Sequence, residues 1–179
     1  MCGRVWLAPE TDLEKYQKIL ADRFSQEILK LWKKTGEFYP SDLLLTIDSR
    51  NNVTLMKWGY DIFNRKVINT RIESIRDKKI YTSDYLSHRC LIPASGFYEW
   101  DHNKRKCYFH TDDNIFYLAG IYQETDGIEQ CSILTKEATS TKGIHDRIPI
   151  VLTRKDAASY LNRPDMDLLF NNHADFTVE

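Results

Sequence analysis

Short apolar segments, each followed by a polar turn, fill most of the chain between residues 43 and 135. Segments of this length suit β-strands, and the first two flank the polar stretch 48–52, which is typical of a hairpin loop. Short strands joined by such turns pair mainly with antiparallel neighbours. We therefore expect an α+β protein with a mostly antiparallel, barrel-like β core flanked by helices. The expected strands are 43–47, 53–58, 90–93, 97–100, 107–110, 115–122 and 130–135.

Helices are expected before, within and after this region. The longest should cover residues 12–33, because Thr11 and Glu14 have the spacing of a capping box and apolar residues follow at helical intervals. Two shorter helices are expected near 83–88 and 155–162. The apolar residues of the long helix should face the core; they are Leu13, Tyr16, Leu20, Phe24, Ile28 and Leu31.

Length and composition favour a single domain over residues 1–179. A chain of 179 residues with 42% hydrophobic residues can bury a sizeable core. It has no apolar run of about 18 residues, so no membrane span is expected, and its N-terminus lacks the pattern of a signal peptide. The four cysteines are widely spaced without a CxxC pair, which argues against a secreted disulfide scaffold. A cytoplasmic location is expected.

The motifs indicate neither a metal nor an organic cofactor. The five histidines show no HxxxH or HExxH spacing, and the cysteines do not complement them. The sequence also lacks a Walker loop and a GxGxxG string, so a nucleotide-binding fold is not indicated.

The formal net charge of −1 gives no global case for nucleic-acid binding. The charge is unevenly distributed, because residues 57–106 hold eleven Lys and Arg residues against six Asp and Glu residues. This basic middle allows one local anion-binding face, although scattered solvated charges would give the same count.

Cys2 carries the most distinctive chemistry in the sequence. Initiator methionine is normally removed when the second residue is small, so the mature chain can begin with Cys2. An N-terminal cysteine places a thiol next to a free amine with a pKa of about 7.7–8.0. The amine can form a Schiff base with an aldehyde, and the thiol can then close a five-membered thiazolidine on the same carbon. An internal cysteine cannot do this, but a cysteine at position 2 can also be a coincidence.

Three further segments hold groups suited to catalysis. Glu99 is flanked by aromatic residues, and burial there would raise the pKa of its carboxyl group and suit it to general acid–base catalysis. His145 lies in a loop bounded by glycine and proline, where a histidine can carry protons. Asn69 and Arg71 would share one face of a strand, and arginine suits phosphate. An exposed edge glutamate and an ordinary loop histidine are the plain alternatives.

Seven segments occur in the order of one known family. They are MCGR at 1–4, KWG at 57–59, NTRIE at 69–73, RCLIPASGFYEW at 89–100, LAGIY at 118–122, SILT at 132–135 and IHDRIP at 144–149. RCLIPASGFYEW and IHDRIP are long and specific strings. The chain thus resembles the SOS response-associated peptidase (SRAP) family, whose members are also called abasic site processing proteins, over roughly residues 1–162.

The resemblance implies roles for four catalytic residues. Cys2 would be the nucleophile after loss of Met1, acting through both its amine and its thiol. Asn69 would position the ring-opened sugar, Glu99 would be the general acid and base, and His145 would assist ring opening and proton transfer.

The same resemblance implies a DNA-binding surface and a β-barrel-like fold that uses no metal or organic cofactor. The residues that match family positions near DNA phosphates are Arg4, Arg71 and Arg147. The residues that match the surface on which bases near the lesion rest are Trp58, Gly59 and Trp100.

Two features depart from the family pattern. Glu37 stands where members usually carry an asparagine three residues before a proline, and it adds negative charge to a loop expected to contact DNA. The chain also stops at Glu179, whereas the family usually continues through a longer tail beyond Leu161.

We therefore expect the protein to sense abasic sites in single-stranded DNA and to form a covalent thiazolidine crosslink through Cys2, which shields the lesion. A thiol (auto)peptidase using Cys2 with His145 is one alternative, and a non-covalent reader of modified DNA is another. Residues placed before Cys2 should abolish the crosslink but be tolerated by a peptidase, and a reader should still bind after Cys2→Ala. A monomer is expected.

Overall fold

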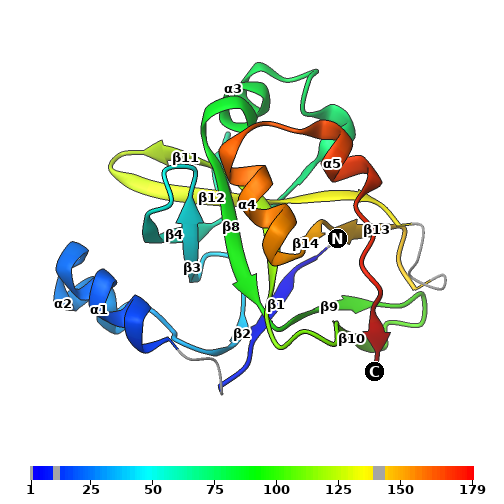
Figure 1. Cartoon of the computed structure of the whole chain (residues 1–179), viewed down its shortest axis with the longest axis horizontal. Coiled ribbons are helices and arrows are strands. Elements are labelled where there is room, and N and C mark those ends of the chain that lie inside the picture. Colours follow the sequence, from blue (N-terminus) through cyan, green and yellow to red (C-terminus); the bar gives the residue numbers. More distant parts are fainter. Residues whose placement is uncertain (1, 10–12, 139–143) are drawn as a thin grey trace.

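The computed structural model describes residues 2–9, 13–138 and 144–179. Its centre is a closed barrel of five strands, each paired with two neighbours (Figure 1). The barrel strands are β3 (Leu43–Asp48), β4 (Val53–Trp58), β8 (Arg89–Ala94), β11 (Phe116–Thr125) and β12 (Ile128–Glu137). Within these five strands, only β12 and β4 pair in parallel, while the β4–β3, β3–β8, β8–β11 and β11–β12 pairings are antiparallel. The prediction of a mostly antiparallel, barrel-like core is confirmed.

The β3–β4 hairpin forms at the expected polar stretch because its residues satisfy one another. The Asp48 carboxylate accepts the backbone N–H groups of Arg50 and Asn52 at 2.9 and 2.8 Å. Asn51 adopts a φ of 61°, in the left-handed region that asparagine tolerates better than most residues. The turn therefore sets the register of two barrel strands.

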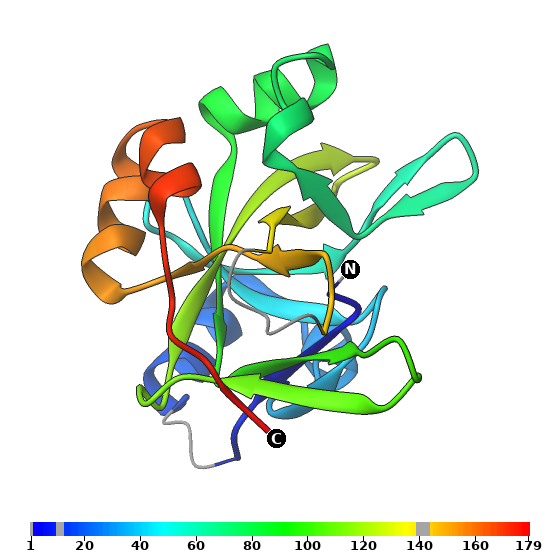
Figure 2. The same cartoon turned by 90° about the vertical axis from the view of Figure 1, so that its right-hand side faces the viewer.

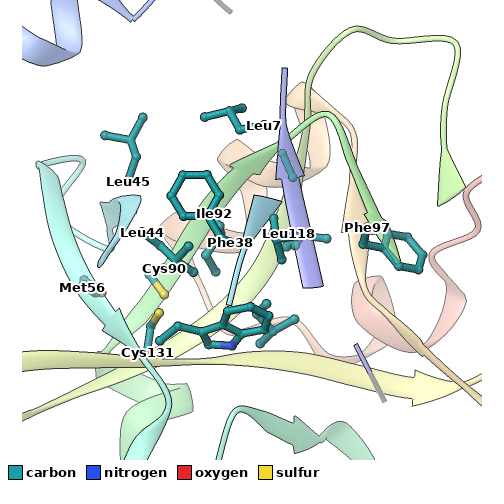
Figure 3. Packing of buried hydrophobic residues seen from close by; sticks show 14 of the residues in the cluster. Leu7, Phe38, Leu44, Leu45, Met56, Cys90, Ile92, Phe97, Leu118 and Cys131 are labelled. Carbon is teal, nitrogen blue, oxygen red and sulfur yellow. The ribbon is translucent and has the colours of Figure 1, made fainter. Parts of the chain in front are cut away.

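A second, five-stranded antiparallel sheet packs against the barrel. Its order is β15 (Thr177–Val178), β10 (Lys106–His110), β9 (Gly96–Trp100), β1 (Arg4–Leu7) and β2 (Gly36–Phe38). Side chains alternate between the faces of a strand, so Phe97 and Glu99 lie on the inner face of β9. Phe97 stacks on Phe109 with ring centroids 5.0 Å apart, and it lies in the shared core that Figure 3 shows. The apolar inner face thus carries one carboxylate, Glu99, into the interior.

Barrel residues fill the same core from the other side. Cys90 of β8 and Cys131 of β12 are fully buried and lie beside Met56 and Ile92 (Figure 3). Cys107 of β10 is half-buried and lies opposite Glu99 of β9. Of the three internal cysteines, only Cys107 is therefore partly accessible to solvent.

The predicted helix over 12–33 is wrong in its extent. Two helices form instead, α1 (Glu14–Arg23) and α2 (Gln26–Leu31), because the chain is extended at Phe24 and Ser25. The Ser25 hydroxyl accepts the Ile28 N–H and so begins α2. Leu31 is 76% exposed, so the apolar stripe reaches the core along α1 but not at the end of α2. The capping box at Thr11 lies outside the described residues.

Two buried cations fasten the remaining helices, α3 (Lys79–Ser87), α4 (Arg154–Asn162) and α5 (Met166–Asn171), to the barrel. Arg89 of β8 donates to the carbonyl oxygens of Tyr85 and Tyr160, at the ends of α3 and α4, at 2.9 and 2.8 Å. Lys136 of β12 donates to the Leu169 carbonyl of α5 at 3.2 Å. Carbonyl groups at a helix C-terminus favour such cations. Of the described helices, none is long and apolar enough to cross a membrane.

Short strands place further segments around β12. β7 (Asn69–Arg71) pairs with it in parallel, and β13 (Arg147–Pro149) pairs with it antiparallel; β14 (Val151–Leu152) follows on β11. β7 is reached through the hairpin of β5 (Tyr60–Ile62) and β6 (Arg65–Val67), which projects from the body of the molecule in Figure 2. The chain end carrying residue 2 lies close to these segments, between this hairpin and the β9–β10 hairpin (Figure 2).

Candidate active site around residue 2

Cys2 is fully buried and lies two residues before the start of β1. The side-chain amide of Asn69, at the start of β7, donates to the Cys2 carbonyl oxygen at 2.8 Å. The parallel pairing of β7 with β12 brings Asn69 to this position, because it sets Asn69 opposite Ile133. Two of the predicted catalytic residues, 67 positions apart, therefore share a direct hydrogen bond.

Glu99 reaches the same place from β9, which pairs with β1 so that Arg4 lies opposite Tyr98. Its carboxyl group is on the inner face and nearly fully buried. Burial disfavours the charged form and raises the pKa of Glu99 above its ordinary value. The predicted rise in this pKa is confirmed, and the carboxyl group is suited to give and take a proton nearer neutral pH.

His145 completes the group from the segment before β13. Its Nε2 lies 3.9 Å from Oε2 of Glu99. Its Nδ1 accepts the backbone N–H of Arg147 at 3.0 Å, so in the neutral ring Nε2 carries the proton and faces the carboxylate. The structure thus brings together all four predicted catalytic residues.

The thiol of Cys2 is not a preformed thiolate. Burial, and after it the negative charge of Glu99, raise the pKa of Cys2 well above its ordinary value. The thiol contacts the Arg4 carbonyl oxygen as a donor at 3.7 Å, which also requires the protonated form. Nucleophilic attack by this sulfur therefore needs a base to accept its proton.

The side-chain oxygen of Asn69, Oδ1, is able to accept a hydrogen bond from a ligand. This oxygen is buried, and among the described residues no hydrogen-bond donor reaches it. A buried acceptor without a partner costs free energy, so such atoms are commonly satisfied by a ligand or by water. The amide is thus oriented by Cys2 on one side and able to accept a hydroxyl or amine proton on the other.

The structure places some of the predicted DNA-binding residues at the surface and buries or pairs the others. Arg71 is exposed and lines an open pocket together with His145 and Arg147. Arg4 and Trp100 lie on the outer face of the β1–β9 sheet, with the Arg4 guanidinium carbon 5.7 Å from the Trp100 ring centroid. These three residues are accessible to a ligand.

The expectation for Trp58 and Gly59 requires correction. Trp58 is fully buried, and its indole N–H donates to the Ile68 carbonyl at 3.0 Å, so no base can rest on its ring in this structure. Gly59 is buried as well, with a φ of 110°, and its N–H donates to the Cys131 carbonyl at 2.8 Å. Both residues shape the chain that leads into Asn69 rather than a binding surface.

Arg147 also differs from the expectation of a phosphate contact. Its guanidinium donates two hydrogen bonds to the Glu73 carboxylate, both at 2.9 Å, and a third to the Thr135 carbonyl at 2.8 Å. The two parallel donors of this guanidinium are therefore already occupied by a carboxylate, although that carboxylate itself is partly exposed to solvent. Arg147 therefore holds β13, and with it the His145 segment, against β12.

Glu73 is the partner that sequence reasoning gave no role. Besides Arg147, its carboxylate accepts the backbone N–H of Glu137 at 3.1 Å. It belongs to the NTRIE string, so the motif contained it, but its partner Arg147 is 74 positions away in sequence. Glu37 was placed in a loop and lies instead in β2, opposite Trp6.

No group of three or more His, Cys, Asp or Glu side chains within the described ranges is arranged to hold a metal ion. The four predicted catalytic residues contribute one thiol, one carboxyl group, one imidazole and one amide. This set can perform acid–base chemistry around the nucleophile of residue 2 with its own groups.

Comparison with known proteins shows which proteins the chain is similar to. The profile of a family described as SOS response associated peptidase (SRAP) matches residues 1–174. The chain is similar to the abasic site processing protein YoqW of Bacillus subtilis, with 29% identity over 93% of this chain and 83% of that protein. It is 30% identical to the abasic site processing protein YoaM of the same organism, over 90% of this chain and 79% of that protein.

Two solved structures show the same fold. A protein from Bacteroides thetaiotaomicron superposes with a TM-score of 0.77 at 23% identity, covering 99% of this chain and 90% of the other. A phage-related protein from Bordetella bronchiseptica superposes with a TM-score of 0.76 at 22% identity, covering 99% and 93%. The β barrel, the second sheet and the helices thus form an arrangement that recurs in other proteins.

Proposed function

Because the chain belongs to the SOS response associated peptidase (SRAP) family, we propose that it processes abasic sites by linking itself covalently to them. The reacting residue is Cys2 at the N-terminus after removal of Met1. The product is a thiazolidine that joins the sugar of the lesion to the protein and shields it. The substrate is single-stranded DNA, and the protein acts as a monomer in the cytoplasm, on the DNA it protects.

The observation that carries this proposal is the convergence of side chains from three separate segments on residue 2. Asn69 is bonded to the Cys2 carbonyl at 2.8 Å, and the Glu99 charge is near enough to raise the pKa of the Cys2 thiol. His145 lies 3.9 Å from Glu99. An amine, a thiol and two proton-transfer groups are what ring opening, imine formation and ring closure require.

Imine formation needs a proton donor near neutral pH. An abasic sugar is a cyclic hemiacetal in equilibrium with an open-chain aldehyde, and His145 and Glu99 exchange the protons that open the ring. The Cys2 amine adds to the aldehyde carbon, and Glu99 protonates the resulting hydroxyl, which leaves as water. Burial raises the pKa of Glu99, so more of the carboxyl group is in the acid form that this step consumes.

Ring closure needs a proton acceptor. Loss of water leaves a protonated imine. The sulfur of Cys2 bonds to its carbon and gives its proton to the Glu99 carboxylate, while the electron pair of the C=N bond returns to the nitrogen, which becomes the secondary amine of the ring. No oxidant or reductant takes part. Because the reacting groups are held in one site, these steps are intramolecular, which removes much of the entropic barrier. The cyclic product resists the hydrolysis to which a bare Schiff base is subject.

Access to the site supports single-stranded DNA as the substrate. Cys2 and Glu99 are buried, so the abasic sugar must leave the base stack to reach them, and a paired duplex resists this. Arg71 is exposed next to His145 in the same pocket and offers a cation for a phosphate.

A thiol peptidase is less well supported. Such an enzyme needs a cysteine whose pKa is lowered by its surroundings, whereas burial raises the pKa of Cys2. A non-covalent reader would not need the amine and thiol of residue 2 to be surrounded by proton-transfer groups.

The proposal is tested on a denaturing gel with Met1-processed protein and single-stranded DNA that bears one abasic site. A heat-resistant shifted band is expected for the wild type and for Cys107→Ala, which removes an internal thiol that lies opposite Glu99 on β10 and has no free amine beside it. No stable band is expected for Cys2→Ala or for protein extended before Cys2. Cys2→Ser keeps the amine, so it should form a band when the imine is trapped with borohydride.

Each alternative predicts a different result. A peptidase would tolerate the N-terminal extension and would not shift the DNA. A non-covalent reader would bind DNA equally well after Cys2→Ala and would never give a band under denaturing conditions. Absence of a band from protein whose N-terminal Cys2 is verified by mass would overturn the proposal.

A further inference from the structure

The outer face of the second sheet combines cations with aromatic rings. Because directly paired residues lie on the same face, the register of β2, β1, β9 and β10 defines this surface. We call it the outer face; its residues are Arg4, Trp6, Glu37, Tyr98, Trp100, Lys106 and Tyr108. Glu99 lies on the opposite side of β9, so this surface is distinct from the buried catalytic group.

Glu37 is the acidic residue of the outer face, and it binds two of its cations at once. Its Oε1 lies 2.8 Å from Nζ of Lys106 and 3.5 Å from Nε of Arg4. Both cations also lie over aromatic rings: Lys106 Nζ is 3.9 Å from the Tyr98 centroid, and the Arg4 guanidinium carbon is 4.0 Å from that of Tyr39. The rings fix the two cations on either side of a single carboxylate oxygen.

This group of charges remains open to solvent. The side chains of Glu37, Arg4 and Lys106 are 22%, 30% and 41% exposed, so an ion in solution can reach them. The Glu37 backbone is held in β2 by its pairing with Trp6, so the carboxylate can leave by side-chain rotation alone. Phosphate is a stronger ligand than carboxylate for an arginine and a lysine placed side by side, because it offers more charge and more acceptor oxygens.

We propose that Glu37 occupies a phosphate-binding position formed by Arg4 and Lys106, and that a phosphate of the DNA strand flanking the abasic site displaces it. The inference rests on the proposed function, because Arg4 is two residues from Cys2, at most about 7 Å along the chain. DNA binding is then an exchange of anions at this position. By competing for this position, Glu37 lowers the affinity for any DNA strand that cannot supply a phosphate there.

The test is the affinity of Glu37→Gln for undamaged single-stranded DNA, measured by fluorescence anisotropy. The matched control is Glu124→Gln, which makes the same change of charge at an exposed position on β11. Glu37→Gln should bind about two- to fivefold more tightly than the wild type, the range expected for one partly exposed ion pair. The gain should shrink as salt rises from about 0.05 to about 0.2 M, and Glu124→Gln should show no comparable gain.

A double-mutant cycle separates this exchange from a general effect of charge. Lys106→Gln should weaken binding by itself, and the gain from Glu37→Gln should become smaller in the Lys106→Gln background. Equal gains in both backgrounds would overturn the inference. So would a loss of affinity in Glu37→Gln, which would mean that Glu37 orients the two cations for DNA instead of competing with it.

The crosslinking assay keeps this inference separate from the proposed function. If Glu37→Gln binds more tightly but no variant forms a heat-resistant band, the anion exchange stands and the proposed chemistry fails. If the wild type forms the band and Glu37→Gln binds no better than Glu124→Gln, the inference alone is overturned. If neither the wild type nor Glu37→Gln binds DNA, both are overturned.

Discussion

Glu99 and Trp100 are adjacent on β9, yet their side chains lie on opposite faces of the sheet. Glu99 is buried beside Cys2, whereas Trp100 lies opposite Lys106 on the outer face. A DNA strand that contacts both must pass around the sheet at the end of β1, where residue 2 lies. The alternation of a single strand thus separates the chemistry inside the protein from the recognition surface outside it.

Glu99→Gln should slow crosslinking about 10²- to 10⁴-fold, the range for loss of a general acid–base group, while leaving the affinity for undamaged DNA unchanged.

The same Glu99→Gln change should stabilise the fold at neutral pH. The folded pKa of Glu99 is raised by burial, so the folded state holds this proton more tightly than the unfolded state. The free energy of unfolding of the wild type therefore falls as the pH rises from the pKa of Glu99 in the unfolded state to its pKa in the folded state. Each pH unit between these two pKa values corresponds to about 1.4 kcal/mol.

Urea unfolding of both proteins at acidic and neutral pH measures this stability effect. The two proteins should be nearly equal in stability below the unfolded pKa, near 4, where wild-type Glu99 is protonated in both states. A variant that is less stable than the wild type at neutral pH would show that the Glu99 carboxylate is favourably solvated, contrary to the burial seen here.

The barrel could be predicted because its strands carry a strong local pattern. The hairpin of β3 and β4 is marked by two short apolar segments and by the polar stretch at Asp48 between them, and both are properties of adjacent residues. The break between α1 and α2 could not be predicted in this way. Apolar spacing continues through Phe24 and Ser25 without proline or glycine, and Ser25 restarts a helix by capping it.

The site shows the same limit at longer range. Glu99 and His145 were identified as candidates from their surroundings and from the resemblance, but their 3.9 Å approach depends on how β9 and β13 are packed. The burial of Trp58 and the pairing of Arg147 with Glu73 are likewise decided by neighbours that are distant in sequence. A motif can indicate which residues matter without showing which of them faces solvent.

Cys107 should be alkylated faster than the other three cysteines in the native protein. It is half-buried, whereas Cys2 is fully buried with a pKa raised by burial and by Glu99, so little reactive thiolate is present there. Iodoacetamide labelling followed by peptide mass spectrometry measures the order of reaction. All four cysteines should react readily in urea, and rapid native labelling of Cys2 would instead favour a thiolate nucleophile and the peptidase alternative.

Arg147→Ala should lower the free energy of unfolding by about 1–2 kcal/mol, because the buried guanidinium loses its hydrogen bonds to the Thr135 carbonyl and the Glu73 carboxylate. The salt dependence of DNA binding should not change. Arg71→Ala is the matched control: this arginine is exposed, so stability should stay within about 0.5 kcal/mol. DNA affinity should fall, with a salt slope smaller by about one. The reverse pattern would return Arg147 to the phosphate-binding role.

The projecting hairpin of β5 and β6 carries a conformation that its sequence does not favour. Phe63 and Asn64 both have positive φ values, 45° and 61°, as in the tight turns that glycine and asparagine prefer, and Phe63 is 96% exposed. A bulky side chain at a positive φ is sterically unfavourable, and the ring of Phe63 is too exposed to offset this cost by burial. Phe63→Asn should therefore raise the free energy of unfolding by about 0.5–1 kcal/mol in urea titrations. Asn64→Ala should lower it by about 1 kcal/mol, because alanine disfavours the left-handed region. Destabilisation by Phe63→Asn would show that the ring makes contacts that outweigh its backbone strain.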